Sequence, residues 1–227
     1  TLRNYPLNCE SAEQIVRQIA DVEIDDKISF VIKKTEEIME DSEYQGVRLS
    51  LDAYLDKTRI PLKIDISTGD VITPCEISFS YQLMFENRTI PLLAYPPETV
   101  LAEKLETILS RGEANTRLRD FYDVYILQRE DFVVTPDALC HALLATCRKR
   151  GHEDLLHTYA SILDRVRQSD TMRTQWMKYQ SDFDYAAGIT WDTVLDTVET
   201  LCMKTLDDHA FGDELPQEES QFEMHLL

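Results

Sequence analysis

Residues 47–67 read VRLSLDAYLDKTRIPLKIDIS and alternate apolar with polar side chains on both sides of a short polar break. Asp56 and Lys57 form that break. Two alternating runs joined by so short a connection are typical of an antiparallel hairpin with one apolar face. Counting outward from the turn places Arg48 opposite Asp65 on the polar face. The stretch therefore predicts a β-rich first part of the chain.

The patterns on either side of this hairpin predict an α+β fold. Residues 11–20 are expected to form an amphipathic helix with Ser11 as its N-cap, and residues 28–33 a strand. Further short strands are expected at 77–81, 83–86 and 89–93. After Pro96-Pro97 the apolar residues recur with the spacing of a helix. Helices are predicted at 98–111, 118–128, 136–150, 155–166, 171–179 and 190–206. The predicted domains are a β-rich part at 1–95, a helical domain at 96–206 and an acidic tail at 207–227.

The composition is strongly acidic. The 227 residues contain 23 Lys and Arg and 42 Asp and Glu, which gives a formal net charge of −19. This balance argues against a general nucleic-acid coat protein or a membrane-surface binder, because both need a supply of basic side chains. No apolar run approaches the roughly 20 residues that cross a bilayer. Five dispersed cysteines without a Cys-x-x-Cys motif favour a reducing, cytoplasmic setting over a disulfide framework.

One stretch departs from this acidic balance. Residues 140–180 contain seven Lys and Arg against four Asp and Glu. Two interpretations stay open: the basic residues lie on solvated helix faces, or they form a contact surface for a polyanion.

Residues 118–127 belong to a predicted helix that is apolar on two sides and nevertheless contains charged residues. Leu118 and Phe121 lie on one apolar face, and Asp120 and Asp123 lie opposite, beside Arg119. Buried carboxylates are costly unless they are paired or bound to a ligand. The pattern therefore indicates either a structural ion cluster or a binding site.

Three other residues offer charged groups for either interpretation. Lys104 and Arg111 share one stripe of the preceding helix, where they could grip a phosphate chain or join two helices by salt bridges. Asp65 lies between two isoleucines on a strand, and such a rigidly held carboxylate suits metal-assisted phosphoryl transfer. Its predicted partner Arg48 makes a routine cross-strand ion pair equally compatible with the sequence.

Three segments together resemble the AbiEii/AbiGii toxins, which are nucleotidyltransferases of abortive-infection, type IV toxin–antitoxin systems. The segments are PLKIDISTGD at 61–70, YPPETVLAEKL at 95–105 and RGEANTRLRDFYD at 111–123. The resemblance is strongest over residues 44–128. It implies a partial nucleotidyltransferase domain with a mixed sheet, similar to that of DNA polymerase β, followed by a helical domain.

The resemblance also implies roles for individual residues. Asp65 would be a metal-site carboxylate, Lys104 would contact the nucleotide, and Asp120 or Asp123 would belong to the catalytic motif downstream. Supporting phosphate contacts are implied for three arginines, Arg111, Arg117 and Arg119. The implied substrate is a nucleoside triphosphate with Mg²⁺ or Mn²⁺, the acceptor is RNA with tRNA foremost, and the partner is a cognate antitoxin protein, with no membrane involved.

The chain departs from the family pattern at its start. The family opens with a Gly-Gly helix turn and an Asp-x-Asp strand that supplies the first two metal carboxylates, and neither occurs here. The sequence therefore predicts an N-terminally truncated toxin that is inactive, whereas the intact protein is an enzyme. Two alternatives stay open: a non-catalytic interaction module with a structural ion network, and a small-molecule nucleotidyltransferase of the antibiotic-modifying type.

Overall fold

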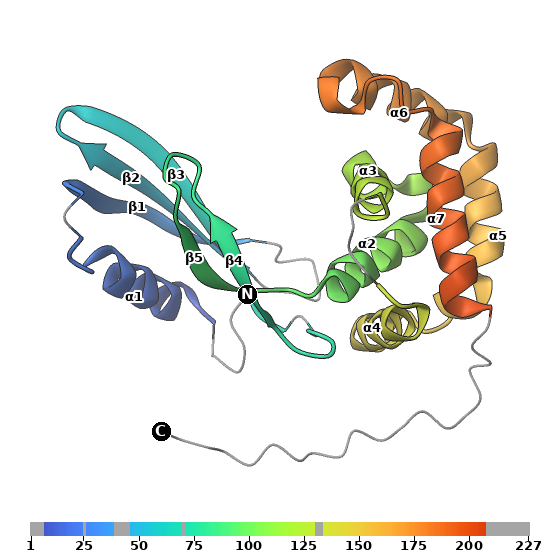
Figure 1. The fold of residues 1–227 in the computed structure, drawn as a ribbon, viewed down its shortest axis with the longest axis horizontal. Helices are drawn as coiled ribbons and strands as arrows, with labels where there is room; N and C mark the ends of the chain where they lie inside the picture. The colour runs from blue at the N-terminus through green and yellow to red at the C-terminus, as the bar shows by residue number, and fades with distance from the viewer. Residues whose placement is uncertain (1–6, 25, 39–45, 70, 130–133, 208–227) are drawn as a thin grey trace, which may run out of the picture. The chain divides into compact units, whose positions relative to one another are not determined.

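The protein is organised as two compact units, Thr1–Val71 and Ile72–Leu227 (Figure 1). The computed structural model describes residues 7–24, 26–38, 46–69, 71–129 and 134–207. Within these ranges the chain forms helices and two small antiparallel sheets, so the predicted α+β class is confirmed. None of the helices in these ranges has the length and apolar character needed to span a bilayer.

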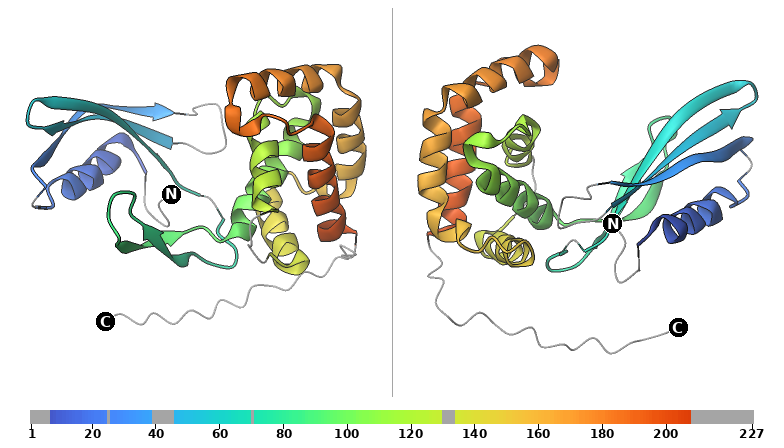
Figure 2. Two further views of the ribbon diagram at one scale, coloured as in Figure 1. Left: turned by 45° about the horizontal axis from the view of Figure 1, so that its top comes forward. Right: turned by 180° about the vertical axis from the view of Figure 1, so that it is seen from behind.

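The described part of the first unit is a three-stranded antiparallel sheet in the order β1-β2-β3, with one helix packed against it (Figure 2). Its elements are α1 (Cys9–Ala20), β1 (Ile28–Ile38), β2 (Gly46–Leu55) and β3 (Thr58–Ser67). The central strand β2 supplies most of the small core: its buried side chains Val47, Leu49 and Leu51 pack with Ala12 and Val16 of α1. The period-2 pattern of β2 thus buries one face of the sheet under an amphipathic helix.

The β2–β3 register is the one that the turn predicted. Arg48 lies opposite Asp65, and Ser50 lies opposite Lys63. Asp56 turns the chain with a φ of 52°, a left-handed conformation that Asp tolerates better than most residues. The prediction of a hairpin with a polar face that carries Arg48 and Asp65 is therefore confirmed.

Two local predictions in the β-rich part are wrong. The N-cap of α1 is Asn8, and Ser11 is its partner: Ser11 N donates to Asn8 Oδ1 over 2.8 Å, and Asn8 N donates to Ser11 Oγ over 3.0 Å. The predicted strand at 83–86 is a loop. The side chain of Gln82 bridges this loop, because its Nε2 donates to the Glu86 carbonyl over 2.8 Å.

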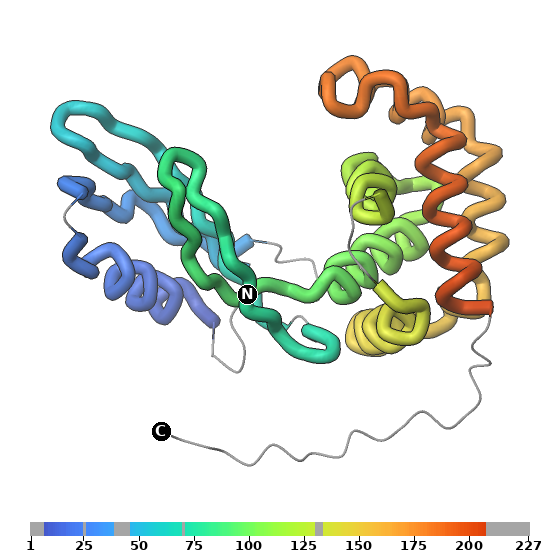
Figure 3. Tube along the Cα trace, viewed as in Figure 1, coloured from blue at the N-terminus to red at the C-terminus, as the bar shows by residue number. Residues whose placement is uncertain are grey.

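In its described residues, the second unit begins with a hairpin and continues as six α-helices, all of which the periodicity predicted with small shifts at their ends (Figure 3). The hairpin consists of β4 (Ile77–Gln82) and β5 (Thr89–Ala94). The helices are α2 (Pro97–Arg111), α3 (Leu118–Leu127), α4 (Pro136–Lys149), α5 (Leu155–Gln168), α6 (Asp170–Asp182) and α7 (Trp191–Leu206).

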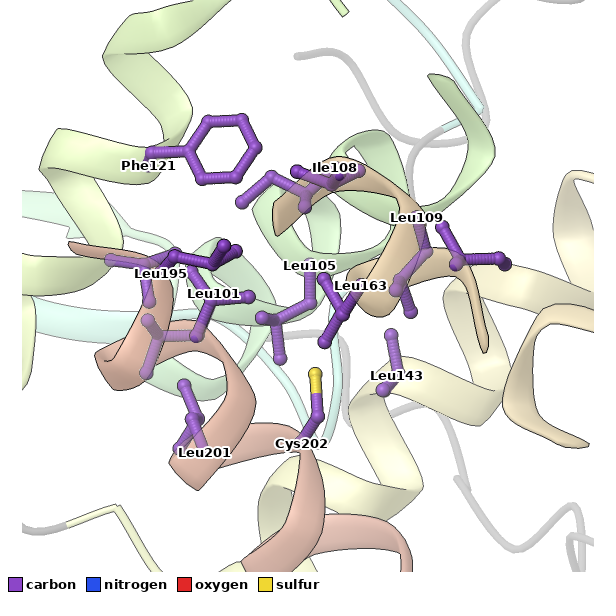
Figure 4. Packing of buried hydrophobic residues seen from close by; sticks show 14 of the residues in the cluster. Leu101, Leu105, Ile108, Leu109, Phe121, Leu143, Leu163, Leu195, Leu201 and Cys202 are labelled. Carbon is purple, nitrogen blue, oxygen red and sulfur yellow. The ribbon is translucent and has the colours of Figure 1, made fainter. Parts of the chain in front are cut away.

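Helix α2 is the centre of this unit, because it packs on α3, α4 and α5. Its residues Leu101, Leu105 and Ile108 are fully buried, and Figure 4 shows them among side chains from α3, α4, α5 and α7, including Phe121 and Leu195. A helix buried on most of its surface can carry charged groups only where they find partners.

The compact units divide at a different place from the domain boundary predicted between 95 and 96. Residues 72–95 fall with the helices. Thr73 N donates to Thr99 Oγ1 over 2.9 Å, and the same hydroxyl donates to the Thr73 carbonyl over 3.1 Å, which fastens the chain before β4 to the first turn of α2. The predicted acidic tail lies, apart from Asp207, outside the described residues.

Candidate functional site

A tight connection brings the end of α2 and the start of α3 to one place. Gly112 ends α2 with a φ of 48°, a conformation that strains residues with a Cβ atom, and one turn of 3-10 helix follows at Gly112–Ala114. Asn115 is fully buried, and its Oδ1 accepts a hydrogen bond from Arg117 N over 2.7 Å. This turn sets the position of Arg117 and starts α3 at Leu118.

Lys104 of α2 is held between two carboxylates of α3. Its Nζ donates to Asp123 Oδ2 over 2.6 Å and to Asp120 Oδ1 over 3.2 Å. The Asp120 side chain is 4% exposed, whereas the Lys104 side chain is 20% exposed. Two acceptors fix the ammonium in one position, while part of the Lys104 side chain stays open to solvent.

Two arginines share the same carboxylates. Arg117 Nε lies 3.0 Å from Asp120 Oδ2, although not in hydrogen-bond geometry, so this buried oxygen accepts no hydrogen bond. Arg119 Nε lies 3.7 Å from Asp123 Oδ2. Both arginine side chains are more than half exposed, so their guanidinium groups remain accessible to a ligand.

This cluster lines a cavity of about 690 Å³, called here the Lys104 cavity. On the side of α2 and α3 it is lined by Lys104, Thr116, Arg117, Leu118, Arg119, Asp120 and Asp123. On the side of α6 it is lined by Gln175, Lys178, Tyr179, Asp182 and Phe183. Four cations against three carboxylates leave one surplus positive charge, in a protein whose net charge is −19. The local balance favours an anionic ligand.

Five of the seven sequence-predicted site residues line the Lys104 cavity, and the structure does not test the other two as members of this site. Arg111 is exposed at the end of α2 and does not line the Lys104 cavity. Asp65 lies in the other compact unit, where Arg48 Nε and Nη2 each donate to one of its oxygens over 2.7 Å. The cross-strand ion pair is thus present, and the metal-binding role of Asp65 stays a prediction.

The residues of the α6 wall were missed by the sequence analysis. Tyr179 and Phe183 stand four positions apart, a spacing typical of side chains on one helix face. Nothing in the local pattern, however, indicates that this face lies across from α3. The contact between α3 and α6 follows from how both helices pack on α7.

The donor set of the described residues does not fit a divalent metal ion. No group of three or more His, Cys, Asp or Glu side chains stands ready to hold one in the ranges that the structure describes. Asp120 and Asp123 bind Lys104, and both oxygens of Asp65 bind Arg48. In these ranges the three carboxylates therefore pair with the protein's own cations.

The basic stretch 140–180 is largely neutralised by acidic residues of the same unit. Five of its seven basic residues form ion pairs: Arg148 with Glu153, Arg150 with Glu106, Arg165 with Glu113, Arg167 with Glu199 and Arg173 with Asp192. Lys178 lines the Lys104 cavity. This arrangement favours solvated helix faces over a broad polyanion surface.

Comparison with known families identifies the class of protein. Residues 9–197 match the model of the family described as "Nucleotidyl transferase AbiEii toxin, Type IV TA system". The match covers most of the chain, so the protein belongs to the AbiEii family, and the family predicted from the three sequence segments is confirmed. Neither the curated proteins nor the solved structures contain a match to this chain.

Replacing Lys104 tests whether the ion cluster contributes to stability. Lys104→Ala is expected to lower the free energy of unfolding of the second unit by about 1–3 kcal/mol, because the Asp120 carboxylate would stay buried with only Arg117 beside it. Urea unfolding followed by tryptophan fluorescence measures this unit, since both tryptophans lie in α6 and α7.

The matched control for this measurement is Lys178→Ala. Lys178 lines the same cavity but makes no ion pair with any described residue, so the substitution should change the free energy of unfolding by less than about 0.5 kcal/mol. Equal unfolding midpoints for the two variants would show that the cluster contributes nothing to stability.

Because of the Arg48–Asp65 pair, the difference in melting temperature between the wild type and Asp65→Asn should depend on pH. The hydrogen bonds from Arg48 hold the pKa of Asp65 below its ordinary value, so the ionised carboxylate stabilises the folded sheet above the ordinary pKa, and this stabilisation is lost as the pH falls through the lowered pKa. Asp65→Asn should therefore melt at a slightly lower temperature than the wild type at pH 7. The difference should shrink between about pH 5 and about pH 2 in scanning calorimetry.

Asp56→Asn is the control for the pH series. Asp56 is an exposed carboxylate in the same hairpin that pairs with no cation in the described part of the chain. Its substitution removes a carboxylate of the same hairpin without breaking an ion pair, and a constant offset for Asp65→Asn across the whole pH range would contradict the assignment.

Proposed function

We propose that the Lys104 cavity binds the triphosphate of a nucleoside triphosphate and that the protein transfers the nucleotide to an RNA acceptor, tRNA foremost. The family is one of nucleotidyltransferase toxins, which gives the reaction class. The observation that carries the assignment to this cavity is the Lys104 ammonium, fixed by two α3 carboxylates and open to a cavity with surplus positive charge.

Three physical features support a phosphate ligand. Arg117 and Arg119 present exposed guanidinium groups, which match phosphate oxygens in geometry. The first turn of α3 borders the cavity and has no side-chain cap, so its backbone N–H groups and helix dipole also favour an anion. The cavity volume of about 690 Å³ lies within the range of small-molecule sites.

Lys104 has a defined role in this proposal. When the nucleotidyl group leaves the triphosphate, negative charge develops on the departing pyrophosphate, and an ammonium already in place stabilises it without reorganisation. Asp120 and Asp123 act as positioning residues, because they hold Lys104 and do not contribute charge toward the phosphates. Arg111 does not line the cavity and takes no part in this proposal.

The acceptor and the partner follow from the family. A type IV toxin–antitoxin family implies a cognate antitoxin. We assign the reaction to the cytoplasm, where nucleoside triphosphates and tRNA occur. Most basic residues of the stretch 140–180 are paired with acidic residues of the protein, so this stretch should make few contacts with RNA phosphates. The affinity of the protein for RNA should therefore depend only weakly on salt concentration.

Arg119→Ala tests the phosphate site without breaking the buried cluster. Its guanidinium is 3.7 Å from Asp123 and mostly exposed, so the fold should be unchanged, whereas tripolyphosphate binding should weaken roughly tenfold. The control is Arg165→Ala, an arginine outside the cavity with the same 3.7 Å distance to its partner Glu113. Isothermal titration calorimetry that shows equal affinities for the two variants would rule out this site.

The acceptor is tested by label transfer. With α-³²P-labelled nucleotides, the protein should label a tRNA pool and leave aminoglycosides unlabelled, because the proposed reaction joins the nucleotide to RNA. Label on the aminoglycoside alone would support the small-molecule nucleotidyltransferase instead. Binding of nucleotide without transfer to either acceptor would favour the non-catalytic module or the inactive truncated toxin that the sequence predicts.

A further inference from the structure

The α6 wall of the Lys104 cavity is aromatic, in contrast to the charged wall formed by α2 and α3. Tyr179 and Phe183 both line the cavity, together with Gln175. A site with cations on one side and aromatic rings on the other has the two surfaces that a nucleotide presents: an anionic phosphate chain and a flat base.

Tyr179 is held rigidly by its neighbours. Its ring stacks on Trp176 with a centroid distance of 5.3 Å and an interplanar angle of 26°. The Trp176 ring is buried, and its Nε1 donates to the Ile189 carbonyl over 2.8 Å. The Tyr179 hydroxyl is 2.9 Å from that of Tyr185, and burial together with this hydrogen bond raises the pKa of Tyr179. The neutral ring thus forms a fixed backing for the cavity.

Phe183 lies in front of this backing at the end of α6. Its backbone is extended, with φ −136° and ψ 104°, so the chain leaves the helix at this residue. Its ring centroid lies 4.7 Å from that of Tyr179, tilted by 45°, and 5.3 Å from that of Tyr185, stacked at 29°. Even with these two neighbours the residue is 42% exposed. The two neighbouring rings therefore cover only part of the Phe183 ring, and apolar surface of this residue remains exposed where it lines the cavity.

We propose that Phe183, backed by Tyr179, is the platform on which the base of the bound nucleotide stacks while its phosphates reach Lys104 and Arg119. This inference rests on the proposed function and extends it to the nucleobase. Stacking on an aromatic ring tolerates every base, because each base has a π-face. The structure therefore assigns nucleotide affinity, rather than choice among the four bases, to Phe183.

Gln175 supplies a polar contact beside the platform. Its Oε1 is buried and accepts no hydrogen bond from any described residue, although the residue lines the cavity. A buried acceptor without a donor is costly, and an N–H group on the edge of a stacked base would satisfy it. This observation is independent of the ring geometry.

The test measures the contribution of the base to binding separately from that of the phosphates. Calorimetric titrations of the full chain use the four nucleoside triphosphates and, in parallel, inorganic tripolyphosphate. Phe183→Leu keeps an apolar side chain but removes the ring, so it should weaken binding of each nucleotide about tenfold and leave tripolyphosphate binding within about twofold. Phe183→Trp, which keeps a ring, should bind nucleotides at least as tightly as the wild type.

The matched control is Phe85→Leu. Phe85 is 94% exposed in the loop between β4 and β5 and does not line the cavity, so the same substitution there should leave all affinities unchanged. Equal nucleotide affinities for Phe183→Leu and Phe85→Leu, with tripolyphosphate still bound, would overturn the stacking platform and leave the phosphate site intact. Failure of the unaltered chain to bind tripolyphosphate or any nucleotide would instead overturn the proposed function, and the platform with it.

Discussion

The buried carboxylate of Asp120 is the constraint on which the site depends. A charge that is 4% exposed inside a helical core would be strongly destabilising without a partner, and Lys104 provides one from the neighbouring helix. The pair fixes α2 against α3, and Asp123 completes the hold on the ammonium. A structural requirement of the core thus places a partly exposed cation, in one orientation, at the edge of a cavity.

A second buried charge fixes the other side of α2. Glu106, 2% exposed, pairs with Arg150, which follows α4, and lies 2.6 Å from His152 Nδ1. Lys104 and Glu106 are two residues apart and point to different neighbours, so α2 is tied to α3 through one and to α4 through the other. Rigid placement of Lys104 is what electrostatic stabilisation of a departing pyrophosphate requires.

Those parts of the fold that depend on local periodicity could be predicted from the sequence. The β2–β3 register followed from counting out from Asp56-Lys57, because a strand has a period of two and the turn sets the origin. The mixed faces of α3 indicated that Asp120 was buried and needed a partner. The N-cap at Asn8 was missed because both Asn8 and Ser11 are good capping residues, and only the reciprocal hydrogen bonds decide between them.

The candidate site was predictable only in part, because its far wall depends on tertiary packing. Lys104 and Asp123 were identified from helix faces and from the family resemblance, whereas Phe183 and Gln175 reach the cavity through the packing of α6 across from α3. The two sequence interpretations of the ion cluster also prove compatible: it is a salt-bridge network between helices, and it lines a cavity suited to an anion.

A crystal structure of the chain with a non-hydrolysable nucleoside triphosphate tests the central claim most directly. We expect electron density for the phosphates within hydrogen-bond distance of Lys104 Nζ and of the guanidinium groups of Arg117 and Arg119. A nucleotide bound elsewhere on the protein, with the Lys104 ammonium still shielded by Asp120 and Asp123, would contradict it.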